Sequence, residues 1–552
     1  MARFYGLRGT KLNVMIGFIA GLDFLLFGYD QGVMGSLLTL SSFANQFPEI
    51  NTTSAGEVGL TASEKSFRST VQGVMTASYN LGCFVGAVLC IWVGNYLGRR
   101  KTIFLGSAIM VVGATLQASA FTLPHLIVGR VITGLGNGLN TSTVPTWQSE
   151  CSKSHRRGQL VMMEGSLITC GIMISYWLDF GFSWLDPSSV AWRFPLAFQI
   201  FFALIILFFV LPLPESPRWL ILKGHEEEAV EVLCAILDLP AEDPYVHTEF
   251  TAIKDSVLDA QDVSFSDLFT MDENRHFHRV ALAYVNQMFQ QISGINLITY
   301  YAATIYENSI GMSGTMSRIL AACNGTEYFL ASLIPIWISE KVGRRPLMLV
   351  GAVGMSLSMV VLAITTSFTG QSGPGIAAAV FLFVFNTFFA WGWLGMTWLY
   401  PAEIVPLRIR APANALSTSA NWIFNFLVVM ITPVGFDTIG YKTYIIFAVI
   451  NAFIVPVVYF FYPETAYRSL EEMDAIFHKT KSVFTVVRIA RDEPRRYGKN
   501  GELLINYDET EEHLRRASHF SDKATTVHHN DQASTHVDLE RGAKGAESSD
   551  SN

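Results

Sequence analysis

Long apolar segments recur about twelve times along this 552-residue chain, and each is long enough to cross a lipid bilayer as a helix. Half of all residues are apolar and only 15 % are charged, which is far from the composition of a soluble enzyme. The sequence therefore predicts an all-α membrane protein with twelve transmembrane helices, near residues 12–38, 70–93, 103–121, 126–147, 160–181, 192–213, 279–303, 316–339, 346–368, 375–399, 413–435 and 443–462.

Basic residues gather in the loops on one side of this arrangement. Lys and Arg are enriched in cytoplasmic loops, so that side is predicted to be cytoplasmic, with both termini inside, in a multi-pass protein of the plasma membrane. No cleavage site follows the first span, which is therefore expected to remain as an anchor. The clusters are Arg99, Arg100 and Lys101; Lys153, Arg156 and Arg157; Lys341, Arg344 and Arg345; and Arg408 and Arg410.

The loop at about residues 39–69 is then predicted to lie outside. It holds a glycosylation sequon at Asn51, which we expect to be modified. Two other sequons, at Asn140 and Asn324, fall within predicted spans and are expected to stay unmodified.

The second half of the chain repeats the charged features of the first. The loop at residues 94–101 reads GNYLGRRK, and that at 340–346 reads EKVGRRP. Glu150 precedes Arg157 by seven residues, and Glu403 precedes Arg410 by seven. Such groups can bond helix ends in one state and separate in another, although ordinary positive-inside charge is the plainer interpretation. The repetition predicts two six-helix bundles, 1–213 and 277–462.

The segment QQISGINLITYY, from Gln290 to Tyr301, places amides and two tyrosines inside an apolar run. Ser293 and Gly294 are positioned to loosen the helix, which is tolerated where the backbone lines a cavity. Amides donate and accept hydrogen bonds at once, so they suit a ligand made of hydroxyl groups. The alternative is that these amides only hold helices together.

Two charges are predicted to be buried in the membrane, Asp30 in the first span and Arg130 in the glycine-rich GRVITGLGNG of the fourth. A carboxylate beside an arginine stays ionised, and it can take a proton when the pair separates and water leaves. The pair is therefore a candidate proton switch; a static structural salt bridge is the alternative.

Two polar regions flank the C-terminal bundle: a cytoplasmic linker at 214–276, with helix-like stretches around 226–237, and a tail at 463–552 that is expected to be mostly disordered. Neither contains a catalytic constellation. The six cysteines lie in spans or cytoplasmic loops, so neither a disulfide framework nor a metal site is expected. We also expect no cofactor, no nucleic-acid partner and no obligate protein partner.

The motifs PESPRWL, the two GRR loops, GRVITGLGNG, QQISGIN and PETAYRSLEE occur in this order, and with them the chain resembles the sugar porter family of the major facilitator superfamily over about residues 10–480. NTSTVPTWQSE and the run from Glu164 to Phe182 resemble a fungal group of monosaccharide and polyol proton symporters.

The resemblance implies a sugar site between the bundles and assigns roles to matching residues. The substrate contacts would be Gln290, Gln291, Asn296, Trp398, Asn421, Trp422 and Asn425, with Tyr300 and Tyr301 as an extracellular gate. Asp30 and Arg130 match the proton-coupling pair, and the cytoplasmic latch would comprise Glu150, Arg157, Glu340, Arg344, Glu403 and Arg410.

Three positions depart from the family pattern. Gly165, preceded by Glu164, replaces a glutamine that usually contacts sugar, and Tyr328, preceded by Glu327, replaces an asparagine. Asn95 replaces an acidic residue in the first GRR loop, which is expected to weaken one latch contact.

The function that we expect is import of a hexose or pentose by proton symport, through alternating access and without enzymatic activity. A proton-independent facilitator and a polyol or glycerol symporter are the alternatives, and a sugar sensor is a further one. The tail lacks the length and motifs typical of sensors.

Overall fold

The computed structural model describes residues 3–53, 56–151, 157–261, 265–272, 274–368, 372–406, 409–468 and 470–494. Contacts divide the chain into two units, Met1–Ala466 with Met473–Asp492, and Tyr467–Glu472 with Glu493–Asn552. The contacts described below lie within the first unit.

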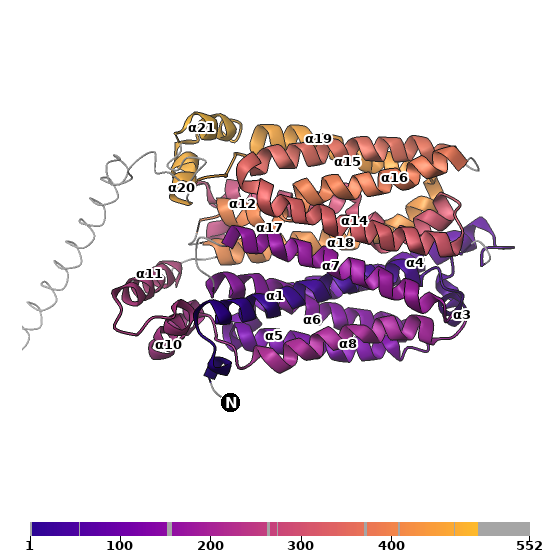
Figure 1. Cartoon of the computed structure of the whole chain (residues 1–552). Helices are drawn as coiled ribbons and strands as arrows, with labels where there is room; N and C mark the ends of the chain where they lie inside the picture. The colour runs from indigo at the N-terminus through magenta and orange to yellow at the C-terminus, as the bar shows by residue number, and fades with distance from the viewer. Residues whose placement is uncertain are drawn as a thin grey trace, which may run out of the picture. The chain divides into compact units, whose positions relative to one another are not determined.

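The N-terminal half, residues 1–213, is built from long helices that lie side by side (Figure 1). A 3-10 turn at Arg3–Gly6 precedes them, and a shorter helix and turn, α3 (Ser41–Gln46) and η2 (Pro48–Ile50), follow the first span. The main helices are α1 (Gly9–Gly32), α2 (Met34–Leu37), α4 (Ala62–Leu97), α5 (Arg99–Ala118), α6 (Leu123–Glu150), α7 (Arg157–Ser183) and α8 (Val190–Val210).

Short helices follow in the predicted linker, where α10 covers the residues expected to be helical. They are α9 (Pro217–Leu222), α10 (Glu226–Leu237), α11 (Pro244–Gln261) and η4 (Phe265–Phe269).

The C-terminal half, residues 277–462, repeats the set of long helices, and two short helices come after it. Its elements are α12 (His276–Gln290), η5 (Gln291–Ile295), α13 (Asn296–Thr304), η6 (Ile305–Ser309), α14 (Gly314–Val342), α15 (Arg344–Ser367), α16 (Ser372–Phe389), η7 (Ala390–Leu394), α17 (Met396–Ile404), α18 (Arg410–Ile439) and α19 (Lys442–Phe461), then α20 (Leu470–Lys479) and α21 (Val486–Asp492). The predicted tail beyond residue 494 lies outside the described residues.

All twelve expected runs are helical, and ten helices among the described residues are long and apolar enough to cross a membrane. The two remaining runs are α6 and the series from α12 to α13. The first carries Arg130, Asn137 and Asn140 in its buried face, which lowers its hydropathy. The second holds buried amides such as Asn286, Gln290 and Asn296, which lower its hydropathy in the same way. The least apolar runs are therefore those that hold polar groups inside the protein.

Helix α4 begins eight residues earlier than the expected run at 70–93. Thr61 accepts a hydrogen bond from the backbone N–H of Glu64, and the Glu64 carboxylate accepts in return from the backbone of Thr61. This capping box extends the helix over polar residues that a hydropathy pattern does not mark.

The glycines of α6 allow α4 to approach closely, as their spacing suggested. A Cβ atom on Gly134 would lie 2.1 Å from the carbonyl oxygen of Tyr79, and one on Gly138 would lie 2.1 Å from that of Cys83. Any larger residue would push the two helices apart.

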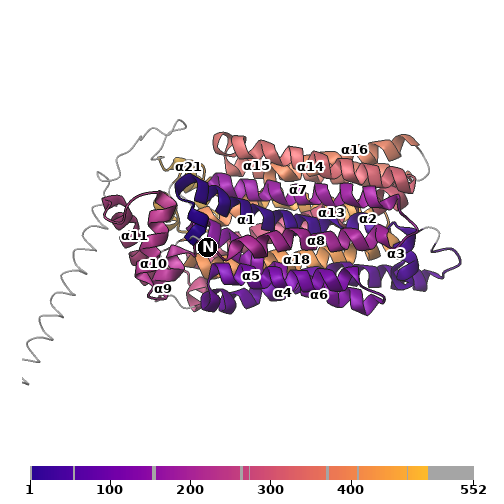
Figure 2. The same ribbon diagram turned by 60° about the horizontal axis from the view of Figure 1, so that its bottom comes forward.

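The two halves meet along α4 with α18 and along α7 with α14, and Figures 1 and 2 show these helices running beside one another. A Cβ atom on Gly73 of α4 would lie 2.3 Å from the carbonyl oxygen of Met430 of α18, so the backbones touch there. This contact positions the polar groups of both halves against each other.

Candidate functional site

The helix from α12 to α13 is broken at the residues that the sequence indicated. Gly294 has φ +101°, and a π-helical turn at Gln291–Ile295 interrupts the helix. The carbonyl of Ser293 is satisfied by the amide of Asn451 at 2.8 Å, and the Ser293 hydroxyl donates to the carbonyl of Gln290 at 2.7 Å. The break is thus held by side chains, which is how irregular backbone persists at membrane depth.

A chain of amide side chains connects this broken helix to α18. Asn421 Nδ2 donates to Gln287 Oε1 at 2.7 Å and to Gln290 Oε1 at 2.9 Å. Gln291 Nε2 donates to Gln290 Oε1 at 3.0 Å, and Asn296 donates to Gln291 Oε1. The structure therefore brings together four of the seven predicted substrate contacts and adds Gln287.

Next to these hydrogen-bonded amides, several polar atoms on α18 are buried and have no hydrogen-bond partner among the described residues. Both polar atoms of the Asn425 side chain are in this state, as are Asn421 Oδ1 and the indole nitrogen of Trp422. Buried polar atoms are normally paired, and an unpaired one costs about 1–3 kcal/mol. Two donors and two acceptors within two turns of α18 form a place where a hydroxylated ligand would bind favourably.

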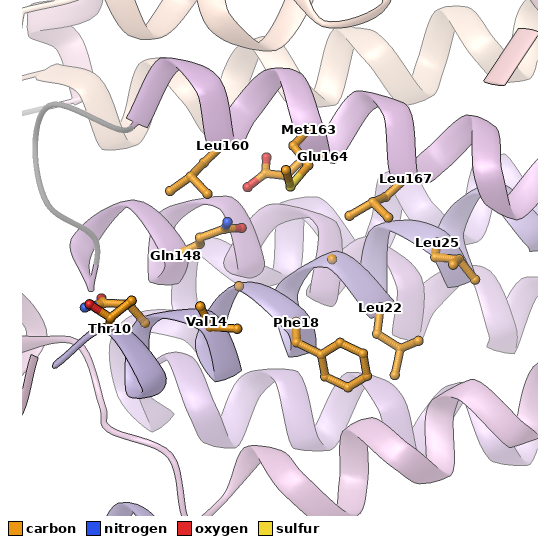
Figure 3. A pocket seen from close by; sticks show the side chains of 13 residues that line it. Thr10, Val14, Phe18, Leu22, Leu25, Gln148, Leu160, Met163, Glu164 and Leu167 are labelled. Carbon is orange, nitrogen blue, oxygen red and sulfur yellow. The ribbon is translucent and has the colours of Figure 1, made fainter. Parts of the chain in front are cut away.

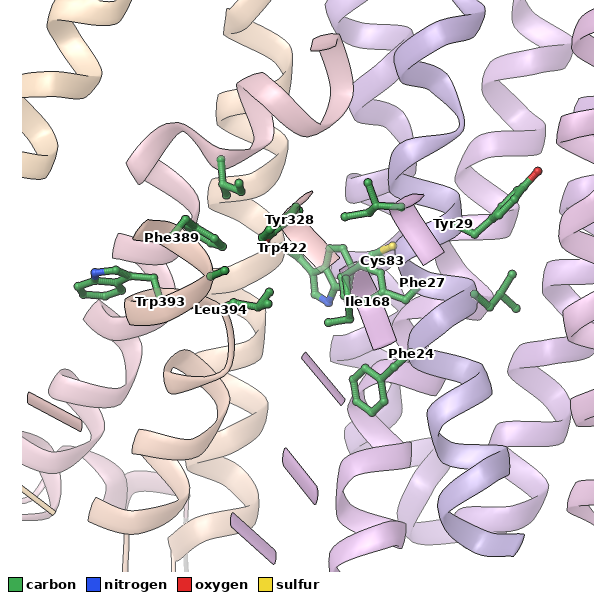
Figure 4. Packing of buried hydrophobic residues seen from close by; sticks show 14 of the residues in the cluster. Phe24, Phe27, Tyr29, Cys83, Ile168, Tyr328, Phe389, Trp393, Leu394 and Trp422 are labelled. Carbon is green, nitrogen blue, oxygen red and sulfur yellow. The ribbon is translucent and has the colours of Figure 1, made fainter. Parts of the chain in front are cut away.

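The indole of Trp422 points from α18 into the N-terminal half. Its ring lies 5.2 Å from that of Phe27 and 6.4 Å from that of Tyr79, both edge to face. Figure 4 shows Trp422 beside Phe27 and Cys83 where the two halves meet. Trp398, the remaining predicted contact, is half-buried on α17.

The two tyrosines of the predicted gate are fully buried and hydrogen-bonded. Tyr300 donates to Asn80 Oδ1 of α4 at 3.1 Å, and Tyr301 donates to the carbonyl of Val429 at 2.9 Å. Arg318 of α14 also crosses between the halves, donating to the carbonyl of Thr39 at 2.8 Å and to its hydroxyl at 3.0 Å. The bonds of Tyr300 and Arg318 therefore join the two halves at the end remote from the GRR loops.

Asp30 and Arg130 are both buried, but they do not form the direct ion pair that the sequence suggested. Tyr79 lies between them: its hydroxyl donates to Asp30 Oδ2 at 3.5 Å, and the Arg130 guanidinium lies 5.4 Å from the centre of its ring. Arg130 donates to the carbonyl of Thr76 at 3.1 Å. Within the described part of the chain, Asp30 Oδ1 and Arg130 Nε have no hydrogen-bond partner.

A second buried carboxylate, Asp23, lies on the same helix as Asp30 and was not predicted. Its Oδ1 accepts from Asn140 Nδ2 at 2.7 Å. This bond also explains why the sequon at Asn140 is inaccessible, since the Asn140 side chain is fully buried. The Asn324 side chain is buried too and accepts from Asn386 Nδ2 at 2.7 Å. Asn51, by contrast, is half-buried in a loop and bonds to Thr53.

The ion pairs described for the latch join residues of the same half. Arg99 contacts Glu150 at 3.1 Å, whereas Arg344 contacts Glu403 at 2.7 Å and Glu340 at 2.8 Å. The set is completed by Arg410, which donates to the carbonyl of Val405 at 3.0 Å, and by Arg157, whose side chain lies outside the described residues.

Glu215 and Glu464, in the PES and PET motifs, hold these two loops by their backbones. Glu215 accepts from the N–H of Arg99 at 2.9 Å, and Glu464 accepts from the N–H of Arg344 at 2.9 Å. In each loop the preceding glycine has a positive φ, 85° at Gly98 and 100° at Gly343. The same arrangement, a GRR loop whose backbone N–H donates to a glutamate, therefore occurs once in each half.

Four residues of this site were missed by sequence reasoning. Gln287 lies one helical turn before Gln290, so its spacing carried a usable signal. Tyr79, Asn80 and Asp23 carried none, because their importance depends on how neighbouring helices are rotated.

The family described as "Sugar (and other) transporter" matches residues 16–477. The Sugar transporter STL1 of Saccharomyces cerevisiae is 40 % identical over 94 % of this chain and 89 % of its own length, and the MFS-type transporter oryC of Aspergillus oryzae is 39 % identical over 90 % and 91 %.

Among solved structures, the fold is similar to that of the proton:xylose symporter XylE of E. coli. The TM-score is 0.71 at 25 % identity, covering 85 % of this chain and all of the other.

Proposed function

The chain belongs to the sugar transporter family of the major facilitator superfamily, and on this premise we propose that it imports a monosaccharide, a hexose or a pentose, by proton symport. It is a multi-pass membrane transporter and not an enzyme. Sugar and proton are its proposed cargo, and the plasma membrane is its proposed location.

The observation that carries the sugar site is the set of unpaired polar atoms on α18. Asn425 offers a donor and an acceptor, Asn421 an acceptor and Trp422 a donor, all without partners among the described residues. A sugar hydroxyl donates and accepts at once, so it can satisfy such a set, while an indole face packs against the C–H face of the ring. Gln290, Gln291, Asn296 and Trp398 complete the proposed site.

The amide chain described above gives this site a means of responding to ligand. Gln291 and Asn296 bond to each other. A sugar that takes these bonds would release the two side chains from each other and change the packing of α13, which carries Tyr300 and Tyr301. We therefore assign the two tyrosines to the gate on the extracellular side.

Proton coupling is assigned to Asp30, with Arg130 as the charge that holds it ionised. Tyr79 contacts Asp30 through its hydroxyl and Trp422 through its ring. It therefore joins the proposed proton site to the proposed sugar site. Similarity to a proton:xylose symporter supports the coupling.

The proposed topology has twelve spans in two bundles, 1–213 and 277–462, joined by the linker 214–276, with both termini and the tail 463–552 in the cytoplasm. Asn51 would then face outside and carry a glycan. The bonds of Tyr300 to Asn80 and of Arg318 to Thr39 join the two halves at the end proposed to be extracellular, while the described ion pairs at the GRR loops join residues of the same half. Both features support an inward-facing state.

Uptake of labelled glucose, xylose, arabinose, galactose and glycerol in a transporter-null yeast, recorded together with external pH, tests the proposal. We expect one sugar to accumulate above its external concentration while the medium becomes alkaline. Uptake that stops at equal concentrations, with no pH change and no sensitivity to an uncoupler, would instead establish a facilitator. Uptake of glycerol alone would make the protein a polyol symporter.

A further inference from the structure

A cavity of about 600 Å³ lies between α1 and α7 and shares no lining residue with the proposed sugar site (Figure 3). It runs along α1 from Thr10 to Leu25, which at helical rise is about 22 Å. Its volume is in the range of small-molecule sites in proteins.

The cavity faces the hydrocarbon of the membrane. The side chains at its edge are apolar and exposed: Val14 is 65 % exposed, Phe18 54 % and Met163 50 %. They belong to helices that are long and apolar enough to span. Exposed apolar side chains on such helices contact lipid, so a membrane lipid is the molecule with access to this cavity.

One charged side chain enters this apolar cavity. Glu164 is only 5 % exposed, lines the cavity, and makes no hydrogen bond or ion pair among the residues described. Two other carboxylates within spans do have partners, the buried Asp23 with Asn140 and the half-buried Glu327 with Thr387. A carboxyl group without a partner at membrane depth is costly, and a donor on a bound molecule would offset that cost.

Polar and apolar groups are segregated within the cavity. Figure 3 shows Gln148 and Glu164 near the middle of the cavity, with Leu22, Leu25 and Leu167 on the side away from Thr10. This arrangement suits a molecule with one polar end and a long apolar body.

We propose that the cavity binds an uncharged membrane lipid with a single hydroxyl head, of the sterol type, whose hydroxyl donates to Glu164. The apolar body would lie along α1 toward Leu22 and Leu25. A phospholipid fits less well, because its phosphate would come close to the carboxylate of Glu164. A free sugar is excluded by the apolar walls.

The first experiment uses the full-length protein in lipid nanodiscs with a photoactivatable sterol that has a free hydroxyl. We expect labelling of peptides that contain residues 10–25 and 160–167. Unlabelled sterol should compete, whereas the sterol methyl ether and phosphatidylcholine should compete about tenfold less, because neither places a neutral hydroxyl donor at Glu164. Equal competition by all three, or labelling spread over all spans, would overturn the proposal.

Two substitutions examine the same site. Glu164→Leu removes the acceptor, and we expect it to reduce labelling about tenfold, while the matched Glu327→Leu leaves labelling unchanged. Gly17→Leu fills the cavity without a clash, because the nearest atom to a Cβ there is Gln148 Nε2 at 4.0 Å. It should abolish labelling while sugar uptake persists. Labelling that survives in both Glu164→Leu and Gly17→Leu would overturn the assignment.

Discussion

The interiors of the two halves differ in the kind of polar group that they bury. The N-terminal half buries charges, with Asp23, Asp30 and Arg130 each at most 2 % exposed. Both halves also bury amides, among them Asn421 and Asn425 of the C-terminal half, but the described residues of that half include no buried carboxylate. Amides keep the same donors and acceptors at any physiological pH, whereas a buried carboxylate changes its charge when it binds a proton. This difference matches the proposed division of roles, in which one half senses protons and the other holds the ligand.

The largest effect on transport is expected from removing the charge of Asp30 in the N-terminal half. Asp30→Asn keeps the size of the side chain but cannot be protonated, so uphill accumulation should be lost while exchange of sugar down its gradient continues. Accumulation and exchange of labelled sugar in vesicles measure both. Glu327→Gln, which neutralises a half-buried carboxylate of the C-terminal half, is the matched control and should accumulate normally. If Asp30→Asn still accumulates sugar, Asp30 is structural.

The second effect concerns the amides. Asn425→Ala removes the unpaired donor and acceptor on α18, so KM for sugar should rise about tenfold, corresponding to the loss of about 1.4 kcal/mol. The rise should be the same at acidic and neutral pH, since no titrating group is changed. Asn386→Ala, in an amide pair elsewhere in the same half, should leave KM unaltered. A normal KM in Asn425→Ala would remove this residue from the site.

Asn296→Ala and Trp422→Ala test the site as a whole. Normal uptake affinity in both variants would refute it.

Tyr79 contacts both Asp30 of the N-terminal half and Trp422 of the C-terminal half. Tyr79→Phe removes the first contact and keeps the second. The ring stays against Trp422, but the hydroxyl that donates to Asp30 is lost. We expect a partial loss of accumulation, about threefold, with KM unchanged, because one hydrogen bond contributes about 0.5–1.5 kcal/mol. Wild-type accumulation would show that the hydroxyl has no part in coupling.

The smallest effect is expected at the GRR loops, where the halves differ by one carboxylate. Among the described ion pairs, the Arg344 guanidinium contacts Glu340 and Glu403, while that of Arg99 contacts Glu150 and has Asn95 at the position of Glu340. Glu340→Gln and Asn95→Glu should shift net transport in opposite directions by about twofold, since each ion pair near the surface contributes less than about 1 kcal/mol. Net uptake compared with equilibrium exchange measures this shift, and changes in the same direction would contradict it.

Sequence alone predicted much of this arrangement, because its signals are local. Hydropathy located the helices, and the pair Ser293 and Gly294 located the break in the helix after α12. The connection from Asp30 to Arg130 could not be predicted, since Tyr79 is 49 residues from the first and 51 from the second. Which face of α4 meets α1 depends on close contacts such as that of Gly134 with Tyr79, and these exist only in the folded protein.

The roles of Glu164 and Glu215 were also beyond sequence reasoning. Glu164 precedes Gly165, which replaces a glutamine that usually contacts sugar, but one residue of helical rotation turns Glu164 toward α1. Glu215 belongs to a recognisable motif, yet its partner is a backbone N–H, which every residue except proline carries.

The most direct measurement of the proposed division between the halves is made on purified protein in proteoliposomes. Sugar affinity and sugar-driven proton flux would be recorded at acidic and neutral pH for the native chain and for Asp30→Asn. We expect the native chain to bind sugar more tightly at acidic pH and to carry protons with it, and Asp30→Asn to bind sugar equally at both pH values without proton flux. A native chain whose affinity ignores pH and whose transport moves no protons would contradict the account.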